Sequence, residues 1–269
     1  MNEFFKVLTS TWWGITIICV VCVIILVLLS MWLYKPFFKR FYDFTLSFWA
    51  LVLLSPLLIV LTVVGAVAMH GNPFFTQARP GKINKKTGKE KIFKLIKFRT
   101  MSNKKDSDGN LLPDEQRLNK YGKFLRSTSL DELPELLNIL IGHMSIVGPR
   151  PQLVRDMVFM TAEQRTRHNV RPGLTGLAQV SGRNAIAWED KLNFDMQYIA
   201  KITFWGDVGI ILKTVFKVLK HSDVVRDGTV SDMDYGDWLL QENVITQEDY
   251  DKKQEEAKEI ILCMNWFQS

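Results

Sequence analysis

The chain has 269 residues, a formal net charge of +6 and a mean hydropathy of +0.03. This length suits one or two domains, and a charged fraction of 23% with 12% aromatic residues excludes a chain that is disordered throughout. Three cysteines exclude a disulfide framework. Residues 71–101 hold nine Lys or Arg and one acid, whereas residues 222–269 hold twelve acids and four bases. A basic body of this kind indicates a partner that carries phosphate, on nucleic acid, on lipid headgroups or on a small substrate.

An uncharged stretch, residues 11–33, is longer than the roughly 20 residues needed to cross a bilayer. Trp13 and Trp32 lie near its two ends, as expected for aromatic side chains at the two membrane interfaces. A cleaved signal peptide is the alternative, but its apolar core is shorter and small residues follow it, whereas Lys35 and Pro36 follow here. We therefore expect residues 1–35 to form an N-terminal transmembrane helix.

A second uncharged stretch, residues 44–69, holds Ser55 and Pro56 at its middle. Proline removes one backbone hydrogen bond and clashes with the preceding turn, so a helix here must bend or break. Basic residues flank the stretch on both sides, and basic flanks favour the cytoplasm. A re-entrant helix, broken at Ser55 and Pro56, keeps both flanks on one side, and Ser55 is then available to satisfy a freed carbonyl. A proline-kinked helix that crosses the membrane fully is the alternative.

The remaining sequence predicts a small body of helices and strands. Residues 73–77 and 91–101 read as the two strands of a β-hairpin. Residues 204–220 place apolar side chains on one helical face and lysines on another, which fits a helix on an anionic membrane surface and equally a helix packed on a core. The fold class is therefore α+β: a mostly helical, membrane-associated domain with one transmembrane helix, one re-entrant helix, a small hairpin and amphipathic surface helices.

Asp131 and Glu132 lie just before Pro134 in an apolar helical pattern. Because proline is tolerated only in the first turn, Pro134 places Asp131 at or near the start of a helix. There Asp131 can be an ordinary N-cap, and Glu132 a charge favoured in the first turn. The same position offers free N–H groups and positive potential to a phosphate and keeps a carboxylate ionised. Both interpretations stay open from this segment alone.

Three later turns combine glycine with arginine: residues 148–151, 171–176 and 179–184. Such turns can present backbone N–H groups and a guanidinium fork to a phosphate, although ordinary surface turns have the same composition. None of them matches GxGxxG, or GxxxxGK followed by Ser or Thr. The sequence therefore indicates neither a Rossmann dinucleotide site nor a P-loop.

Taken in order, these motifs resemble those of one family, the bacterial sugar transferases, which are monotopic phosphoglycosyl transferases that act on polyprenyl phosphate. The resemblance covers about residues 36–221 and leaves the first apolar stretch and the acidic tail outside. The motifs that carry it are Ser55-Pro56, Thr76-Gln77, Arg79-Pro80-Gly81, Lys97-Phe98-Arg99-Thr100-Met101, Arg126, Ser129-Leu130-Asp131-Glu132-Leu133-Pro134, Gly148-Pro149-Arg150-Pro151, Arg171-Pro172-Gly173-Leu174-Thr175-Gly176 and Gly182-Arg183-Asn184.

The resemblance implies transfer of a phosphosugar from a UDP-sugar to polyprenyl (undecaprenyl) phosphate, which gives a polyprenyl diphosphate sugar and UMP. This reaction would be the first membrane step of bacterial glycan assembly. The resemblance further implies that Asp131 is a nucleophile forming an aspartyl-phosphosugar, that Glu132 is its catalytic partner, and that Asp131 and Glu132 hold Mg²⁺. Six basic residues are implied as phosphate-binding: Lys97, Arg99, Arg126, Arg150, Arg171 and Arg183.

The expected organisation is a transmembrane helix at residues 1–35, a transferase domain at 36–221 that includes the re-entrant helix 44–69, and an acidic helical extension at 222–269. Such an extension is expected to pack or to form a homo-oligomer rather than to carry chemistry. The transferase domain would lie on the cytoplasmic face of the bacterial inner membrane, with membrane lipids but no nucleic acid as partners. Two alternatives remain: a membrane-anchored protein that binds anions or nucleic acid and does not need Asp131, and a scaffold built on the tail. The basic stretch lacks the aromatic interleaving of a single-strand binding platform.

Overall fold

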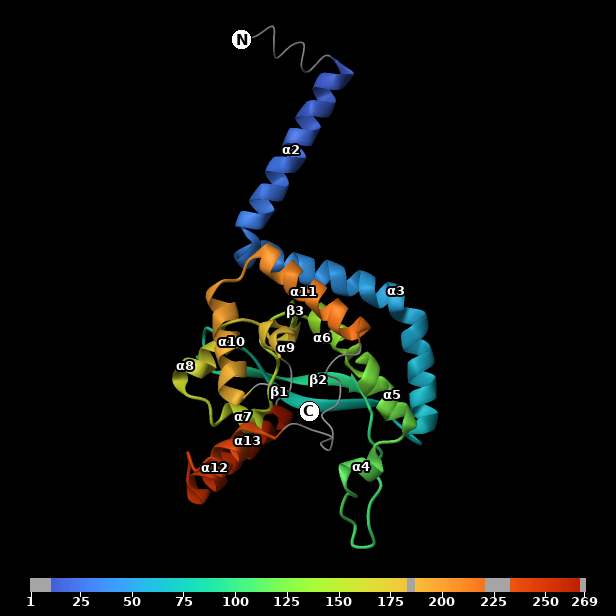
Figure 1. The fold of residues 1–269 in the computed structure, drawn as a ribbon, viewed down its shortest axis with the longest axis vertical. Helices are drawn as coiled ribbons and strands as arrows, with labels where there is room; N and C mark the ends of the chain where they lie inside the picture. Colours follow the sequence, from blue (N-terminus) through green and yellow to red (C-terminus); the bar gives the residue numbers. More distant parts are fainter. Residues whose placement is uncertain (1–10, 183–186, 221–232, 267–269) are drawn as a thin grey trace.

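The computed structural model describes residues 11–182, 187–220 and 233–266. This part of the chain is mostly helical, and its strands form one antiparallel hairpin and one short parallel pair. Figure 1 shows helix α2 (Trp12–Trp32) projecting from a body along which the long helix α3 (Lys39–Ala68) runs. The other elements are η1 (Tyr34–Phe38), β1 (Phe74–Ile83), β2 (Glu90–Phe98), α4 (Asp114–Arg117), α5 (Lys120–Thr128), η2 (Leu130–Glu132), α6 (Glu135–Leu140), β3 (Ser145–Val147), α7 (Val154–Met157), α8 (Ala162–Arg165), η3 (Thr166–Asn169), β4 (Gly173–Thr175), α9 (Leu177–Ser181), α10 (Trp188–Ala200), α11 (Phe204–Leu219), α12 (Tyr235–Gln241) and α13 (Gln247–Trp266).

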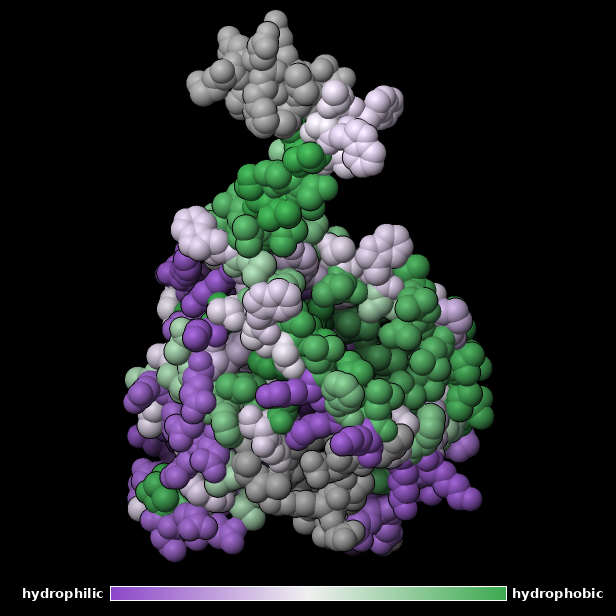
Figure 2. All heavy atoms as spheres, turned by 45° about the horizontal axis from the view of Figure 1, so that its top comes forward, coloured by the Kyte–Doolittle hydropathy of each residue, from purple (hydrophilic) through white to green (hydrophobic). Residues whose placement is uncertain are grey.

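Helices α2 and α3 are both long and apolar enough to cross a membrane. Thr11 caps α2, because its Oγ1 accepts a hydrogen bond from the backbone N–H of Gly14 at 3.2 Å. Exposed side chains of α3 include Trp49 and Val63. Figure 2 shows hydrophobic side chains gathered over α2 and over a broad area of the body beside it. Many large apolar side chains of α2 and α3 are exposed in this way, which is typical of a protein that associates with a membrane.

Helix α3 continues through Pro56 and changes direction about halfway along its length (Figure 1). Pro56 has no N–H to donate to the carbonyl of Val52, four residues earlier. The hydroxyl of Ser55 donates to that carbonyl at 2.8 Å and takes the place of the missing donor. The sequence predicted that Pro56 bends or breaks the helix, and the structure shows a bend within a continuous helix. The Val52 carbonyl that Pro56 leaves without a backbone donor accepts from Ser55 instead.

Both ends of α3 are tied to the same body. Near its start, the Arg40 guanidinium donates to the carbonyl of Leu140 at 2.8 Å, and Asp43 accepts the N–H of Ile146 at 2.9 Å. Near its end, the hydroxyl of Tyr121 donates to the carbonyl of Leu61 at 2.8 Å. Contacts on both sides of the bend hold the two arms of the helix against one folded unit.

The predicted hairpin is confirmed, with strands β1 and β2 paired in antiparallel register from Phe74 opposite Phe98. Strand β1 runs to Ile83, beyond the predicted end at residue 77, and the register shifts after Pro80. Proline is tolerated there because β1 is an edge strand of a two-stranded sheet. One face of β2 buries Phe93 and other side chains against α6. The hairpin and α6 thereby form the support on which the candidate site lies.

The C-terminal helices complete the body. Helix α11 buries Asp207 and Ile210 and exposes Trp205 and Phe216, so it has one packed face and one exposed apolar face. In the tail, Ala257 of α13 joins a buried cluster with side chains of α7, and Ile260 and Ile261 pack against that cluster. The tail was expected to pack or to self-associate: packing is observed for its described residues, 233–266, and self-association stays a prediction.

Candidate active site

The segment that carries Asp131 and Glu132 is a tight turn between two helices. Helix α5 ends at Thr128, Ser129 adopts a left-handed conformation with φ 56°, and η2 then carries both carboxylates. Helix α6 begins at Glu135, and Pro134 occupies its N-cap position without a side-chain capping bond. Asp131 therefore lies near the helix start, as predicted, but the capping interpretation does not hold for it.

Glu132 lies at the centre of a cluster of ion pairs. Its Oε1 accepts from Lys97 Nζ at 2.8 Å and from Arg150 Nη2 at 2.9 Å. Lys97 Nζ also lies 3.1 Å from Oε1 of Glu135, whose side chain is only 4% exposed. Four separate segments thus converge: the end of β2, η2, the first turn of α6 and the loop after β3. The sequence motifs predicted three of these four residues and missed Glu135.

The three carboxyl groups differ in pKa because their surroundings differ. Burial raises the pKa of Asp131 to about 6, and the negative charge of Glu132 adds to that rise. Burial likewise raises the pKa of Glu135 to about 7. Burial on its own would raise the pKa of Glu132 too, but Lys97 and Arg150 outweigh it and hold that pKa well below its usual range. Glu132 is therefore the permanently ionised member of the cluster.

Asp131 and its neighbour Arg126 complete the site. In the described part of the chain, no hydrogen bond or ion pair engages the Asp131 carboxyl, so its oxygens are available to a ligand. Arg126, on the last turn of α5, donates from Nε to Oγ1 of Thr100 at 3.1 Å. Burial lowers the pKa of Arg126, and the charge of Asp131 partly offsets that effect. Asp131 thus combines free oxygens with nearby positive charge.

Two other predicted basic residues are not brought to this cluster, and a third is not among the described residues. Arg171 donates from Nε to the carbonyl of Gly142 at 2.8 Å, beyond the far end of α6. Arg99 follows β2 and donates its backbone N–H to the carbonyl of Pro73, and its side chain makes no ion pair among the described residues. Arg183 lies outside the described residues.

A second layer of residues holds the loop that carries Arg150. Arg167, whose side chain is 1% exposed, donates from Nη2 to Oδ2 of Asp195 at 2.6 Å and to the carbonyl of Arg150 at 2.7 Å. Arg79 donates from Nη1 to the carbonyl of Pro151 at 3.0 Å. Arg79 belongs to a motif that carries the family resemblance, although the sequence predicted no role for it, and no local pattern in the sequence singled out Arg167 or Asp195.

In the described residues, no group of three or more His, Cys, Asp or Glu side chains is placed to hold a metal ion by itself. Mg²⁺ is commonly held by only one or two carboxylates, with the remaining ligands supplied by substrate phosphates and water. The unengaged carboxyl of Asp131 and the ionised Glu132 next to it match that donor set. The residues therefore fit a magnesium ion that arrives with a phosphate ligand.

Comparison with known proteins covers the region that contains this site. The family model described as bacterial sugar transferase matches residues 34–221. The uncharacterized sugar transferase EpsL of Bacillus subtilis is 45% identical over 72% of this chain and 93% of that protein. The UDP-glucose:undecaprenyl-phosphate glucose-1-phosphate transferase of Klebsiella pneumoniae is 38% identical over 67% of this chain. The undecaprenyl-phosphate galactose phosphotransferase of Salmonella typhimurium is 34% identical over 71%. The matches cover 40% and 41% of the lengths of these last two proteins.

Proposed function

This chain belongs to the bacterial sugar transferase family, and we propose that it transfers a sugar 1-phosphate from a UDP-sugar to undecaprenyl phosphate. The printed names of its relatives support this reaction class, because several of them act on undecaprenyl phosphate with glucose or galactose. The observation that carries the proposal is the Asp131 carboxyl, which is unengaged among the described residues and lies beside an ordered pair of cations. A site that only binds anions would be weakened by such a carboxylate, because its negative charge repels the ligand.

The proposed reaction has two displacement steps at one phosphorus atom. A carboxylate oxygen of Asp131 attacks the β-phosphorus of the UDP-sugar. The bond from that phosphorus to the bridging oxygen breaks, and UMP leaves with the electron pair. An oxygen of undecaprenyl phosphate then attacks the same phosphorus, and the aspartyl–phosphorus bond breaks to regenerate the carboxylate. The covalent intermediate separates two phosphate compounds that would otherwise repel each other.

The protonation states support distinct roles for the carboxyl groups. With a pKa of about 6, Asp131 is mostly ionised at neutral pH and can act as a nucleophile. Glu132 stays ionised beside Lys97 and Arg150, so it suits an electrostatic or metal-binding role rather than proton donation. Asp131 and Glu132 would hold Mg²⁺, which would neutralise the diphosphate charge. Arg126 and Arg150 would donate charge-assisted hydrogen bonds to the phosphates.

We further propose that α3 is re-entrant and that the body lies on the cytoplasmic face of the membrane. The start of α3 contacts α6 and its end contacts α5, and both partners belong to one body. A helix that crossed the bilayer would carry one of its ends to the far side. A cysteine introduced at Asn72, in a background without native cysteines, should resist an impermeant reagent in intact cells. Labelling of that cysteine from outside would contradict re-entry.

The direct test of the transferase is formation of the covalent intermediate. The protein is incubated with UDP-sugar and Mg²⁺ but without lipid acceptor, and intact mass is measured. We expect one added phosphosugar and release of UMP, both of which disappear in Asp131→Asn. Asn fits the same space, so folding should persist, and Asp108→Asn on an exposed loop is the matched control. A fully active Asp131→Asn enzyme, or an adduct on another residue, would overturn the assignment.

A further inference from the structure

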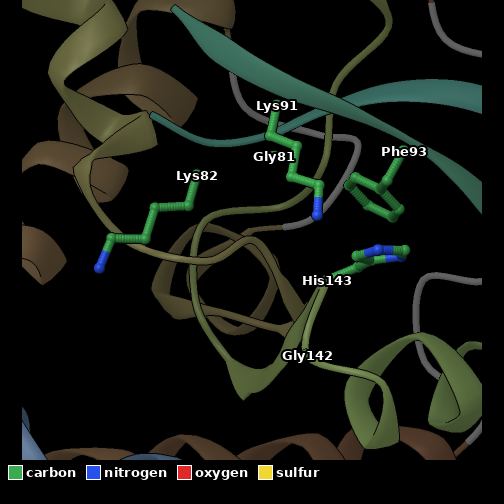
Figure 3. Close-up of a pocket in the computed structure, with 6 residues that line it drawn as sticks. All are labelled: Gly81, Lys82, Lys91, Phe93, Gly142 and His143. Carbon is green, nitrogen blue, oxygen red and sulfur yellow. The ribbon is translucent and has the colours of Figure 1, made fainter. Parts of the chain in front are cut away.

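A second group of cations surrounds a small pocket at the other end of α6. Its lining residues come from the far part of the hairpin and from the turn after α6: Gly81, Lys82, Lys91, Phe93, Gly142 and His143 (Figure 3). We call this the basic pocket. Lys91 lies on the same face of β2 as Lys97 but six residues away, a separation of about 20 Å at roughly 3.3 Å per residue. The basic pocket is therefore separate from the Asp131 cluster.

Positive charge in the basic pocket is not balanced. Among the described residues, neither Lys82 nor Lys91 forms an ion pair with a carboxylate. Arg171 adds a guanidinium behind the pocket, where it donates to the carbonyl of Gly142. Burial and the charge of Arg171 lower the pKa of Lys82, and burial and the charge of Lys91 lower the pKa of His143. These cations repel one another, and a bound anion would relieve that repulsion.

The pocket also has a fixed shape and an unused polar atom. His143 and Phe93 pack ring against ring with centroids 5.4 Å apart, and Nδ1 of His143 is buried without a hydrogen-bond partner in the described structure. A Cβ at Gly81 would lie 2.8 Å from the carbonyl oxygen of Lys91 and 3.1 Å from Cδ1 of Phe93. Glycine therefore lets the hairpin backbone pack closely against the ring that lines the pocket.

We propose that the basic pocket binds a phosphate group. The Lys91 ammonium group, which extends toward the rings of Phe93 and His143 (Figure 3), suits the charge of a phosphate, and the buried Nδ1 of His143 offers a further polar contact. Lys82 begins at the same pocket, and its side chain extends away from these rings (Figure 3). The phosphate could be part of a phospholipid headgroup or a free anion. The pocket lies close to the start of α3, because the Arg40 guanidinium packs against Gly142. The next residue of α3, Phe41, is 60% exposed and belongs to the apolar surface that we assign to the membrane. Arg171 lies beside this pocket and not in the Asp131 cluster, so its positive charge would favour a phosphate bound here.

The test compares full-length protein with the double variant Lys82→Ala/Lys91→Ala. Lys94→Ala is the matched control, because it removes one exposed lysine from the opposite face of the same strand. Two probes separate a lipid phosphate from a free anion. The first is binding to vesicles of phosphatidylcholine with phosphatidylglycerol, compared with vesicles of phosphatidylcholine alone. The second is binding of inorganic phosphate, measured by titration calorimetry. Formation of the Asp131 adduct is measured in parallel as evidence of an intact fold.

Weaker binding of the double variant to the phosphatidylglycerol vesicles, by about tenfold, would identify a lipid phosphate as the ligand. A similar loss for inorganic phosphate, with unchanged vesicle binding, would identify a free anion. Equal binding of the double variant and Lys94→Ala to both probes would overturn the proposal. Because adduct formation depends on Asp131 and not on the basic pocket, failure of this proposal leaves the transferase assignment intact.

Discussion

Replacing Asp195 by Asn would test how the Arg150 loop is supported. Arg167 and Asp195 are 1% and 3% exposed, and Arg167 Nη2 lies 2.6 Å from Asp195 Oδ2. The Nε and Nη1 atoms of Arg167 are buried without partners among the described residues, so no second carboxylate compensates for the loss of Asp195. Breaking a buried ion pair by neutralising one member costs about 3–5 kcal/mol. Asn keeps one oxygen acceptor, so we expect about 3 kcal/mol for Asp195→Asn.

This cost is a large part of a typical domain stability of about 5–15 kcal/mol. For a domain of this size, it corresponds to a decrease in melting temperature of roughly 6–12 °C. Thermal unfolding in detergent, followed by circular dichroism, measures that decrease. The control is Asp190→Asn, which neutralises an exposed carboxylate in the first turn of the same helix and should change stability little.

A second variant separates stability from positioning. Replacing both partners by apolar residues, as Arg167→Met/Asp195→Leu, removes the unpaired charge and should recover much of the lost stability. It still lacks the donor to the carbonyl of Arg150, so phosphosugar adduct formation should stay slow although the protein is folded. The reasoning is refuted if Asp195→Asn melts together with Asp190→Asn, or if the double variant is no more stable than the single one.

Three further outcomes are expected. Adduct formation should fall as the pH decreases through about 6, because protonation of Asp131 removes the nucleophile; a rate independent of pH between 5 and 8 would contradict this role. Pro56→Ala should restore a backbone donor to Val52 and straighten α3, which distance measurement between spin labels on its two arms would detect as an increase. Deletion of residues 233–269 should uncover Val154 and Met157 and lower the melting temperature, whereas an unchanged melting temperature would show that the tail packing is dispensable.

The sequence was informative where the cause of the structure is local. Pro56 interrupts a helix through its own missing N–H, and a basic flank on each side restricts the position of both ends, so the bend could be predicted. Lys97, Glu132 and Arg150 were identified through ordered motifs. Glu135 was missed because an acid in the first turn of a helix is a common stabilising feature, and nothing nearby indicates that it is buried.

Ion pairs between residues far apart in the chain could not be predicted from the sequence. Arg167 and Asp195 are 28 residues apart, and their burial follows only from how η3 packs against α10. Arg171 shows the limit of a motif in another way, because the guanidinium fork that suits phosphate equally suits a backbone carbonyl such as that of Gly142. A motif therefore identifies which arginines matter, while the fold decides what each of them contacts.

The charge arrangement of the site suggests how it would receive a diphosphate. Lys97 is 18% exposed and bridges Glu132 and Glu135, so its two carboxylate partners hold it in place. Arg150 is 44% exposed and pairs with Glu132 from the solvent side, so it can turn toward a ligand at little cost in desolvation. An incoming phosphate would compete with Glu132 for Arg150, and Oε1 of Glu132 would then keep Lys97 as its one partner in this cluster and be more available to Mg²⁺. In this arrangement Arg150 is the residue that responds to substrate, while Lys97 keeps Glu132 ionised throughout.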